Sequence, residues 1–543
     1  MEVTNMKIAR FSSCRGVAFE INPNRSNPFA IGTGASPSED HQHTAGMPVW
    51  LPWNRTSSFK VIPWLNPISP SGSPPSSHFC DIDIAGYDIE QDFIAEFESK
   101  DIEKGEKANA VLKRNSRLSI ILLDQGLFTV YKRLFMVCLT LNMIALAISV
   151  AGHFPYAKRK ASLFSIGNIL ALTLCRSEAV LRIVFWLAVK LLGRPWINLQ
   201  IKTATTSFLQ SLGGIHSGCG MSSIAWLVYA LILTLNDKDN TTPEIIAFAF
   251  TILLLIFLSS IAAFPLVRHI HHNVFERTHR FTGWIALIFL WFFVILSLTY
   301  KPLSKTYDLK FSRLAKQQEF WFTLAITVLI IIPWLTVRKV PVSVLSTSGH
   351  ASIIKFKGGV HPGLLGRISP SPLSEWHAFG IISDGKKEHM MLAGAVGDFT
   401  KSLISKPPSH LWVRKVHFAG LPYLVNMYQR AVLVATGSGI CVFLSFLLQP
   451  CQADVCLIWV AKEIELNYGK EIKELVSKHP REKVIVHDTA IGGRPNVAKM
   501  SADAAIRWNA EAVVVTSNPE GSRDIIRECK RAGIPAFGPI WDS

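Results

Sequence analysis

The chain has little charge for its length. Only 17% of its 543 residues are Asp, Glu, Lys or Arg, whereas soluble domains carry about 25%. Hydrophobic residues make up 49%, which excludes disorder throughout. The nine Cys are scattered without CxxC spacing, so they form no small disulfide scaffold and give no sign of a metal site. What remains is a multi-domain protein with part of its length in a bilayer.

Nucleic-acid-binding motifs are also missing, although the net charge is +17. Residues 131–340 hold 21 Lys or Arg against 7 Asp or Glu, so most of the excess lies among apolar segments. Basic residues flank membrane spans on the cytosolic side. We therefore expect a membrane and no nucleic acid as partner.

The first residues lack the apolar region of a cleavable secretory signal. Residues 1–115 are polar and rich in Ser, Pro and Asn, which predicts a largely disordered N-terminal region in the cytosol.

Six apolar segments follow within 131–337, and each is long enough to cross a bilayer at about 20 residues per helix. They predict a six-helix transmembrane bundle: 134–152, 163–192, 208–235, 243–267, 281–300 and 318–337. The second contains Arg176, Glu178 and Arg182, and we expect the last two to pair at i, i+4 spacing. These charges are also the sole support for a transporter. Six spans place both termini on one side, and the flanking basic residues make that side cytosolic. Plasma membrane and endomembrane both stay open.

The remaining sequence has a different pattern. Between 338 and 425, short β-type runs alternate with Gly, Pro and Ser turns, which predicts an antiparallel β-barrel. From 429 to 543 strands alternate with amphipathic helices, which predicts a doubly wound α/β domain.

The strongest local motif is the strand and Gly turn in Ala431-Val-Leu-Val-Ala-Thr-Gly-Ser-Gly-Ile440. Gly437 and Gly439 allow close approach of a phosphate, and we expect a helix to begin there and supply N–H groups; Ser438 lies between the two. Alone, a GxG turn is a weak signal.

Four short stretches together resemble the ferredoxin–NADP reductase superfamily, in its NADPH oxidase and ferric reductase branch. Glu375-Trp-His-Ala-Phe379 is similar to the family's EWHPF flavin strand, and Val396-Gly-Asp-Phe-Thr400 to its VGDWT segment. Thr436-Gly-Ser-Gly-Ile440 stands at the GAGIG pyrophosphate loop, and Gly493-Arg-Pro-Asn496 matches GRPN. Thr516-Ser-Asn-Pro519 and the C-terminal residues resemble more narrowly the TmpA-type membrane flavoproteins and the C-terminal part of adenylate-forming multidomain enzymes.

This resemblance implies an FAD barrel, an NADP-binding domain, and electron transfer from NADPH to FAD and on to an unidentified acceptor. Arg494 would lie near the 2′-phosphate of NADPH, and Trp541 would stack on the flavin. By strand alternation His377, Phe379 and Ser383 should share a face. Thr400 and the adjacent amides could bind a phosphate. The implied cofactor contacts are His377, Phe379, Ser383, Gly397, Asp398, Thr400, Gly437, Ser438, Gly439, Arg494, Ser517 and Asn518.

Several positions depart from the family pattern. Gly420-Leu-Pro-Tyr423 carries an insertion in the family's GPYG turn, Gly380 replaces the hydroxyl residue of the flavin strand, and Ser517 and Asn518 stand where CGP is usual. The alternative is therefore a catalytically degenerate reductase acting as a nucleotide-sensing receptor or scaffold.

The resemblance also implies haem, but the ligands are incomplete. His216 and His279 correspond to the inner ligands of helices 3 and 5, whereas Ala230 and Phe292 stand at the outer positions. Two haems are excluded by this count. A single haem b and no haem remain equally open.

Overall fold

The computed structural model describes residues 9–12, 18–21, 129–346 and 348–540. Strand β1 (Ala9–Ser12) pairs antiparallel with β2 (Ala18–Ile21) in a separate unit of the chain. Most of region 1–115, for which we predict disorder, and Trp541 lie outside the described residues.

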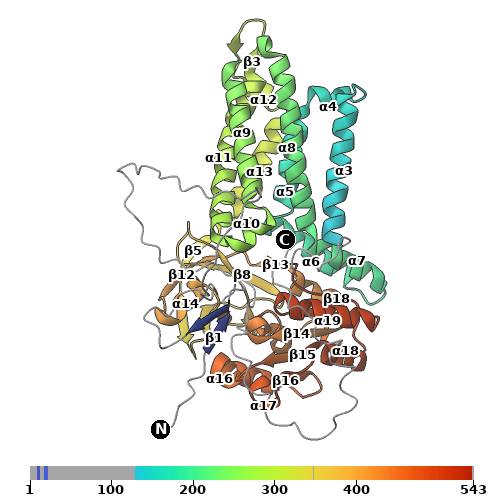
Figure 1. Ribbon diagram of the computed structural model, residues 1–543, viewed down its shortest axis with the longest axis vertical. Helices are drawn as coiled ribbons and strands as arrows, with labels where there is room; N and C mark the ends of the chain where they lie inside the picture. The colour runs from blue at the N-terminus through green and yellow to red at the C-terminus, as the bar shows by residue number, and fades with distance from the viewer. Residues whose placement is uncertain (1–8, 13–17, 22–128, 347, 541–543) are drawn as a thin grey trace, which may run out of the picture. The chain divides into compact units, whose positions relative to one another are not determined.

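Within the part of the chain that the structure describes, five helices are long and apolar enough to cross a membrane. They are α3 (Val130–Val150), α8 (Leu212–Asn236), α9 (Pro243–Ala262), α11 (His272–Thr299) and α13 (Gln318–Leu335). Helix α8 packs against α3, α5 (Ala161–Leu174) and α9, while α11 packs against α9 and α13, in the bundle seen in Figure 1.

The predicted second span is wrong as a single helix. The segment 163–192 breaks at Cys175–Ser177 into α5, with 14 residues, and α6 (Glu178–Leu192), with 15. Each is about 21 Å long at 1.5 Å per residue, shorter than a hydrocarbon core of about 30 Å. Helix α6 instead packs Phe185 on the C-terminal half, with α7 (Leu199–Gln210) beside it. The break comes directly before Glu178, whose ion-pair partners Arg367 and Arg414 lie outside the bundle.

The expected pair of Glu178 with Arg182 is wrong for the same reason. Glu178 forms ion pairs with Arg367 and with Arg414 (3.1 Å), and Arg182 donates to the carbonyl oxygen of His417 at 2.6 Å.

Short elements connect the long helices. Five of them are α4 (Pro155–Arg159), η1 (Lys238–Asn240), β3 (Tyr300–Lys301), β4 (Thr306–Tyr307) and α12 (Phe311–Leu314). They lie at the end of the bundle away from the C-terminal half (Figure 1), where Lys160 pairs with Glu319 at 2.8 Å. Helix α10 (Pro265–Ile270) lies at the other end, between α9 and α11.

Residues 337–419 form two antiparallel sheets around one apolar cluster. The first has the order β10-β11-β7-β6 and the second β13-β8-β12-β5, with β9 paired to β8. The strands are β5 Val337–Pro341, β6 Ser343–Ser346, β7 Ala351–Lys357, β8 Leu364–Ser369, β9 His377–Gly380, β10 Ile382–Ser383, β11 Glu388–Gly394, β12 His410–Arg414 and β13 Phe418–Ala419. Helix α14 (Asp398–Ser405) connects β11 to β12.

The last part is a parallel sheet with the order β16-β15-β14-β17-β18. Its strands are β14 Arg430–Thr436, β15 Asp454–Ala461, β16 Val484–Asp488, β17 Ala512–Thr516 and β18 Ala536–Phe537. The connecting helices are η2 Leu421–Met427, η3 Gly437–Val442, α15 Ser445–Leu448, α16 Ile464–Ser477, α17 Thr489–Gly492, α18 Val497–Arg507 and α19 Pro519–Arg531. The chain runs outward from β14 to β16 and returns through β17, so the order reverses between β14 and β17.

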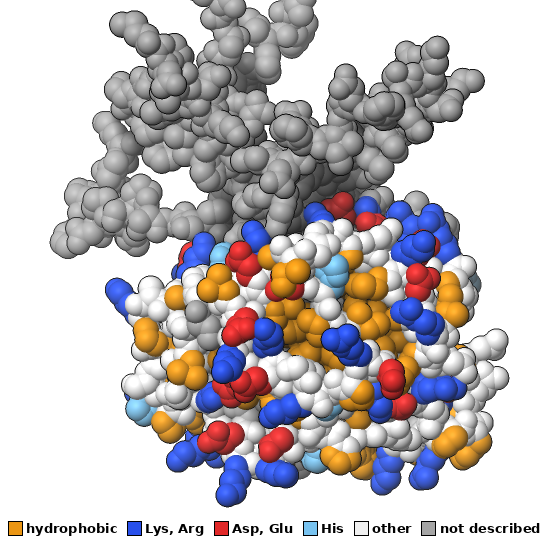
Figure 2. Space-filling model, turned by 90° about the horizontal axis from the view of Figure 1, so that it is seen from below, with side chains coloured by type: hydrophobic (Ala, Val, Ile, Leu, Met, Phe, Trp, Pro, Cys, Tyr) orange, Lys and Arg blue, Asp and Glu red, His pale blue; other side chains and the backbone are white. Residues whose placement is uncertain are grey.

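One apolar core joins the antiparallel sheets to the parallel one. Ile353 and Leu392 of the former belong to the same cluster as Ile440 and Phe443, which follow β14. Figure 2 shows the surface of the C-terminal half from below, where Lys and Arg side chains alternate with Asp and Glu around apolar areas.

Candidate functional site

The carboxyl ends of β14 and β17 meet at the point where the strand order reverses. Nucleotides bind at this kind of crevice in doubly wound sheets. The Thr436 hydroxyl, at the end of β14, donates to the Ser517 hydroxyl after β17 at 2.9 Å. Gly437 turns the chain with φ of +56°, and its carbonyl oxygen accepts from the Trp459 indole at 2.9 Å. The structure thus brings 437–439 and 517–518 to one edge.

The helix expected after the Gly turn is shorter than predicted. Residues 437–442 form a 3-10 helix, and α15 adds only four residues. The run from Ile440 to Leu444 is buried throughout, so it packs as core rather than as one face of an amphipathic helix. Its N-terminus therefore supplies a weaker dipole than a full α-helix would.

A longer helix begins at the same edge after β17. Helix α19 has 13 residues, and the Asn518 side chain caps it by accepting from the Gly521 amide at 2.8 Å. This oxygen is engaged in capping, and the helix N-terminus next to Ser517 presents the N–H groups suited to an anion.

Arg494 lies on the loop between α17 and α18, after β16 at the same edge of the sheet. The loop is shaped by Gly493, with φ of +66° and its carbonyl oxygen 2.8 Å from Nε2 of His487, and Asn496 caps α18 through the Lys499 amide. The Arg494 side chain is exposed and accessible to a ligand.

In the predicted flavin strand, His377 and Phe379 lie on β9 opposite Ile368 and Gly366 of β8. The His377 ring is buried and stacks on Phe399 of α14, with ring centroids 4.3 Å apart. Burial lowers the pKa of His377 to about 4, so the imidazole is neutral near pH 7.

Gly380 ends β9 in direct contact with the segment that follows β14. A Cβ atom at this position would lie 2.6 Å from the Val442 amide nitrogen and 2.7 Å from the Cys441 carbonyl carbon. Only glycine fits, which explains why the hydroxyl residue of the family pattern is absent.

The hydroxyls of Ser383 and Thr400, two of the expected cofactor contacts, both form hydrogen bonds within the fold. Ser383 lies on β10 in the other sheet, so it does not continue the β9 face; its hydroxyl accepts from the Val360 and Gly385 amides and donates to the Glu388 carbonyl. The Thr400 hydroxyl accepts from the Gly397 amide at 2.9 Å and donates to the Gly397 carbonyl. Both hydroxyls hold the fold together. Asp398 is exposed at the start of α14.

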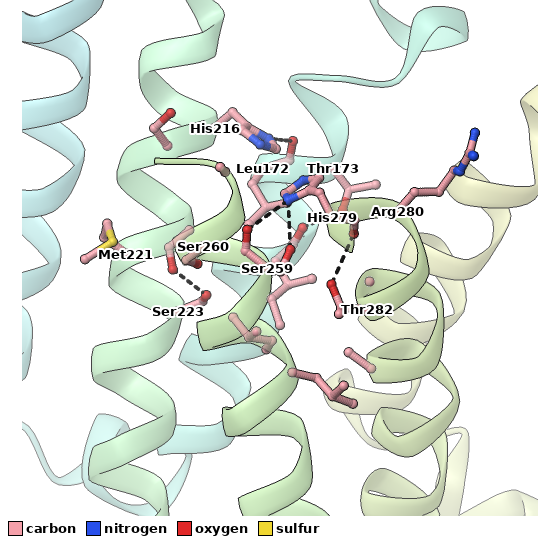
Figure 3. A pocket seen from close by; sticks show the side chains of 18 of the residues that line it. Leu172, Thr173, His216, Met221, Ser223, Ser259, Ser260, His279, Arg280 and Thr282 are labelled. Carbon is pink, nitrogen blue, oxygen red and sulfur yellow. Dashed lines mark hydrogen bonds between the residues drawn. The ribbon is translucent and has the colours of Figure 1, made fainter. Parts of the chain in front are cut away.

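A cavity of about 710 Å³ opens within the bundle, next to His216 of α8 and His279 of α11 (Figure 3). The ring centroids are 6.3 Å apart. Nδ1 of His216 lies 3.0 Å from the Leu172 carbonyl oxygen, and Nδ1 of His279 lies 2.8 Å from the Ser259 hydroxyl. As donors in these bonds, the Nδ1 atoms would leave each Nε2 with a lone pair.

Arginines of α11 connect the bundle to the loop that precedes β9. Arg280 donates to the carbonyl oxygens of Leu373 and Ser374 at 2.8 and 3.1 Å, and Arg277 pairs with Glu375 at 2.6 Å. These contacts link the cavity histidine His279, which precedes Arg280, to strand β9, the predicted flavin strand, which starts at His377.

Sequence reasoning missed the ion cluster of Glu178, Arg367 and Arg414. Burial opposes ionisation of Glu178, but the two guanidinium groups outweigh burial and hold the pKa of this carboxyl below its usual range. The available signal in the sequence was the group of charged residues within the apolar segment 163–192. The partners of Glu178 lie too far along the chain to be predicted.

Comparisons with known proteins agree with the predicted similarity to adenylate-forming enzymes. Residues 421–543 match the family model "Adenylate-forming reductase 03009, C-terminal domain". The chain is 33% identical to adenylate-forming reductase 06235 of Coprinopsis cinerea over 81% of its length, and 32% identical to reductase 03009 of that fungus over 82%. It spans 42% of the length of these relatives.

Solved structures similar to the C-terminal part include reductases. Phthalate dioxygenase reductase aligns with 37% of this chain and 68% of its own, with a TM-score of 0.30 and 12% identity. Ferredoxin-NADP+ reductase from Plasmodium falciparum with 2'P-AMP aligns with 37% of this chain and 95% of its own, with a TM-score of 0.29 and 12% identity.

Proposed function

We propose that the chain is a membrane-bound oxidoreductase that passes electrons from NADPH to FAD on the cytosolic side and on to a further acceptor. The observation that carries the proposal is the meeting of β9 with the Gly437–Val442 segment at the reversal point of a doubly wound sheet. Hydride transfer requires contact between NADPH and the flavin, so the strand that would hold the flavin must lie next to the turn that would hold the nucleotide. The reductase names of the relatives agree with this proposal.

The residues at the sheet edge fit a dinucleotide better than the remaining residues fit a flavin. Residues 437–439, Ser517 and the N-terminus of α19 would take the pyrophosphate, and Arg494 the 2′-phosphate. Asn518 would act by capping α19. His377, Phe379 and the start of α14 at Gly397 and Asp398 would contact FAD, whereas the Ser383 and Thr400 hydroxyls are already engaged. Trp541 remains a proposed stacking partner of the flavin.

The membrane topology is part of the proposal. Five long helices together with the shorter α5 would form the membrane domain. Arg268, Arg277, Arg280, Arg338 and Lys339 lie at the end that meets the C-terminal half, which favours a cytosolic position for that half and for both termini.

A single haem b fits the cavity histidines. Both imidazole rings line the same cavity with their centroids 6.3 Å apart, and imidazole is a usual ligand of haem iron. Hydrogen bonds from Nδ1 to oxygen acceptors are typical of ligating histidines. His216 and His279 would hold the iron, which would supply a one-electron step.

The test is NADPH oxidation by full-length protein purified in detergent and supplied with FAD. We expect Arg494→Glu to raise the KM for NADPH at least 10-fold and Gly439→Trp to abolish turnover, because its side chain would fill the turn. Arg481→Glu, an exposed change before β16 at the opposite edge of the sheet, is the matched control. Protein that binds no flavin would overturn the proposal.

The departures from the family pattern favour a second candidate, a degenerate reductase that senses nucleotide. Gly380 stands where the family has a hydroxyl residue, and the Ser383 and Thr400 hydroxyls are engaged within the fold, so fewer side-chain donors remain for a flavin. This candidate predicts NADPH binding without turnover, and rapid NADPH consumption would exclude it.

A further inference from the structure

We propose that helices α6 and α7 lie in the lipid–water interface at the base of the bundle, with their exposed apolar side chains in the lipid and with Lys190 and Arg194 on anionic phospholipid headgroups. The partner is a phospholipid leaflet that carries negative charge. The proposal rests on the membrane position proposed for the bundle, and it adds a lipid-binding surface outside the five long helices.

Helix α6 is apolar on two opposite sides. On one side, Leu181 and Phe185 pack into the apolar cluster of the antiparallel sheets. On the other side, Ile183, Leu187 and Leu191 follow one another at intervals of four residues, and all three are exposed. A helix that covers a domain in water has polar residues on its outer side. The outer side of α6 therefore fits an apolar environment.

Helix α7 shows the same feature more sharply. Ile201, Ala204 and Phe208 lie three and four residues apart, so they share one side of the helix, and that side is exposed. Lys202 and Thr206 lie on the buried side. This order, with apolar residues outside and polar residues inside, is the reverse of a surface helix in water and fits contact with lipid.

The exposed sides of α6 and α7 continue the outer surface of the bundle. Figure 1 shows both helices at its base, and α7 contacts α3 and α8 near the end at which α3 begins. Met136 and Val137, in the first turns of α3, are exposed as well. Trp196, in the connection between α6 and α7, is 78% exposed. Tryptophan is enriched where a membrane meets water, so its position marks the interface.

The charges of this segment are of one sign. Residues 179–236 contain four Lys or Arg and no Asp or Glu. Lys190 and Arg194 are exposed beside the apolar side chains, and Nζ of Lys190 lies 4.7 Å from the centre of the Trp186 ring. Exposed apolar residues next to basic ones are the surface that binds a leaflet containing anionic lipids.

Photocrosslinking tests whether these side chains touch lipid. The full-length protein, in nanodiscs of phosphatidylcholine and phosphatidylserine in equal amounts, would carry benzoylphenylalanine in place of Trp196 or of Phe208. The same replacement of Leu141, on the outer surface of α3, tests the bundle, and the matched control is Ile506, which is exposed on α18. We expect lipid adducts at 196, 208 and 141 in mass spectrometry, and none above background at 506.

Neutral variants test the preference for negative charge. A basic side chain near a membrane surface enriches anionic lipid by about 5-fold, so phosphatidylserine should exceed phosphatidylcholine in the adducts of position 196. Lys190→Gln combined with Arg194→Gln should bring the two lipids to equal amounts. Lys158→Gln with Arg159→Gln, on α4 at the other end of the bundle, is the matched control and should leave the excess unchanged. An excess that persists without Lys190 and Arg194 overturns their role.

The position of the adducts separates this proposal from the proposed function. Adducts at 141 without adducts at 196 and 208 overturn the interfacial position of α6 and α7 and leave the membrane position of the bundle intact. No adduct at 141 overturns the membrane position itself, and this proposal with it. A crosslink from 196 or 208 to a second protein chain places a protein on this surface and also overturns the proposal. NADPH oxidation is not needed for any of these results.

Discussion

The helix bundle and the C-terminal half place their apolar side chains in opposite ways. On the bundle, Leu141 and Leu254 are 62% and 65% exposed, and whole helices are apolar on every side. In the parallel sheet, β14 and β17 bury nearly all of their side chains, and charges of both signs are scattered around the apolar area on the face of the C-terminal half seen in Figure 2. The first arrangement suits lipid and the second suits water.

The junction between these regions follows neither rule. Glu178 and Arg414 are largely buried there and joined in an ion cluster, and Arg277 and Arg280 hold the loop before β9. Buried charges would be costly in lipid, and exposed ion pairs contribute little stability in water. At the junction, a partly buried ion cluster can hold two dissimilar surfaces together. The predictions below test this difference between the regions, in order of expected effect.

Glu178→Ala should have the largest effect. The change leaves Arg367 and Arg414 without their buried acid, and breaking a buried ion pair costs about 3–5 kcal/mol. Thermal unfolding of the detergent-solubilised protein should shift markedly downward. Glu465→Ala, which removes an exposed partner of Lys473, is the control and should shift it little. Equal shifts would mean that the junction is not held by this cluster.

Acid should destabilise the C-terminal half. Burial lowers the pKa values of His377 and His417 to about 4, so between pH 6.5 and 4 the unfolded chain binds protons that the folded domain does not. The free energy of unfolding should therefore fall as pH drops through this window, by about 1.4 kcal/mol per pH unit for each histidine, and level off below it. Pulse proteolysis across pH checks this. The slope should decrease in His377→Phe, and an unchanged slope would contradict the assignment.

Gly380→Thr restores the family's hydroxyl residue and should destabilise the protein. The new Cβ atom would clash with the Val442 amide, at a cost of about 1–3 kcal/mol. Urea unfolding measures this loss in the free energy of unfolding. Gly349→Ala, where a Cβ atom has no atom within 4 Å, is the control. A stable Gly380→Thr variant with higher flavin content would show instead that the antiparallel sheets and the parallel sheet move apart at this contact to admit a flavin.

Asn518→Ala should have the smallest effect on stability, because it removes one helix cap, at about 1 kcal/mol. Its NADPH affinity should fall modestly, since α19 begins at the proposed pyrophosphate site. Asn496→Ala removes the corresponding cap of α18 and makes a matched comparison. Identical NADPH affinity in both variants would argue against a role for the α19 N-terminus.

The strands were largely predictable from the sequence, because their apolar runs are short and bounded by turn residues. Strands such as β7 and β17 lie within the two regions where strands are predicted, 338–425 and 429–543. Five of the six predicted spans contain a long apolar helix, whereas 163–192 divides at its charges. Hydropathy averaged over the segment hides such a break. The charged residues that follow it, Glu178 and Arg182, find their partners far along the chain, at 367, 414 and 417.

The candidate site was less predictable than the fold. The meeting of 437–439 with 517–518 follows from strand order, which the alternation of strands and helices already indicates. The engaged hydroxyls of Ser383 and Thr400 do not follow from it, because a motif gives the residue type and not its hydrogen-bond partners. The replacement of a hydroxyl residue by Gly380 was visible in the sequence, but its cause, the nearby backbone of 441–442, required the structure.

The most direct test is the absorption spectrum of FAD-supplied, detergent-purified protein before and after NADPH under anaerobic conditions. The proposal predicts a bound flavin whose visible band bleaches on addition of NADPH, and does not bleach at the same NADPH concentration in Arg494→Glu. Protein without flavin, or a flavin band that NADPH leaves unchanged, would contradict the reductase function.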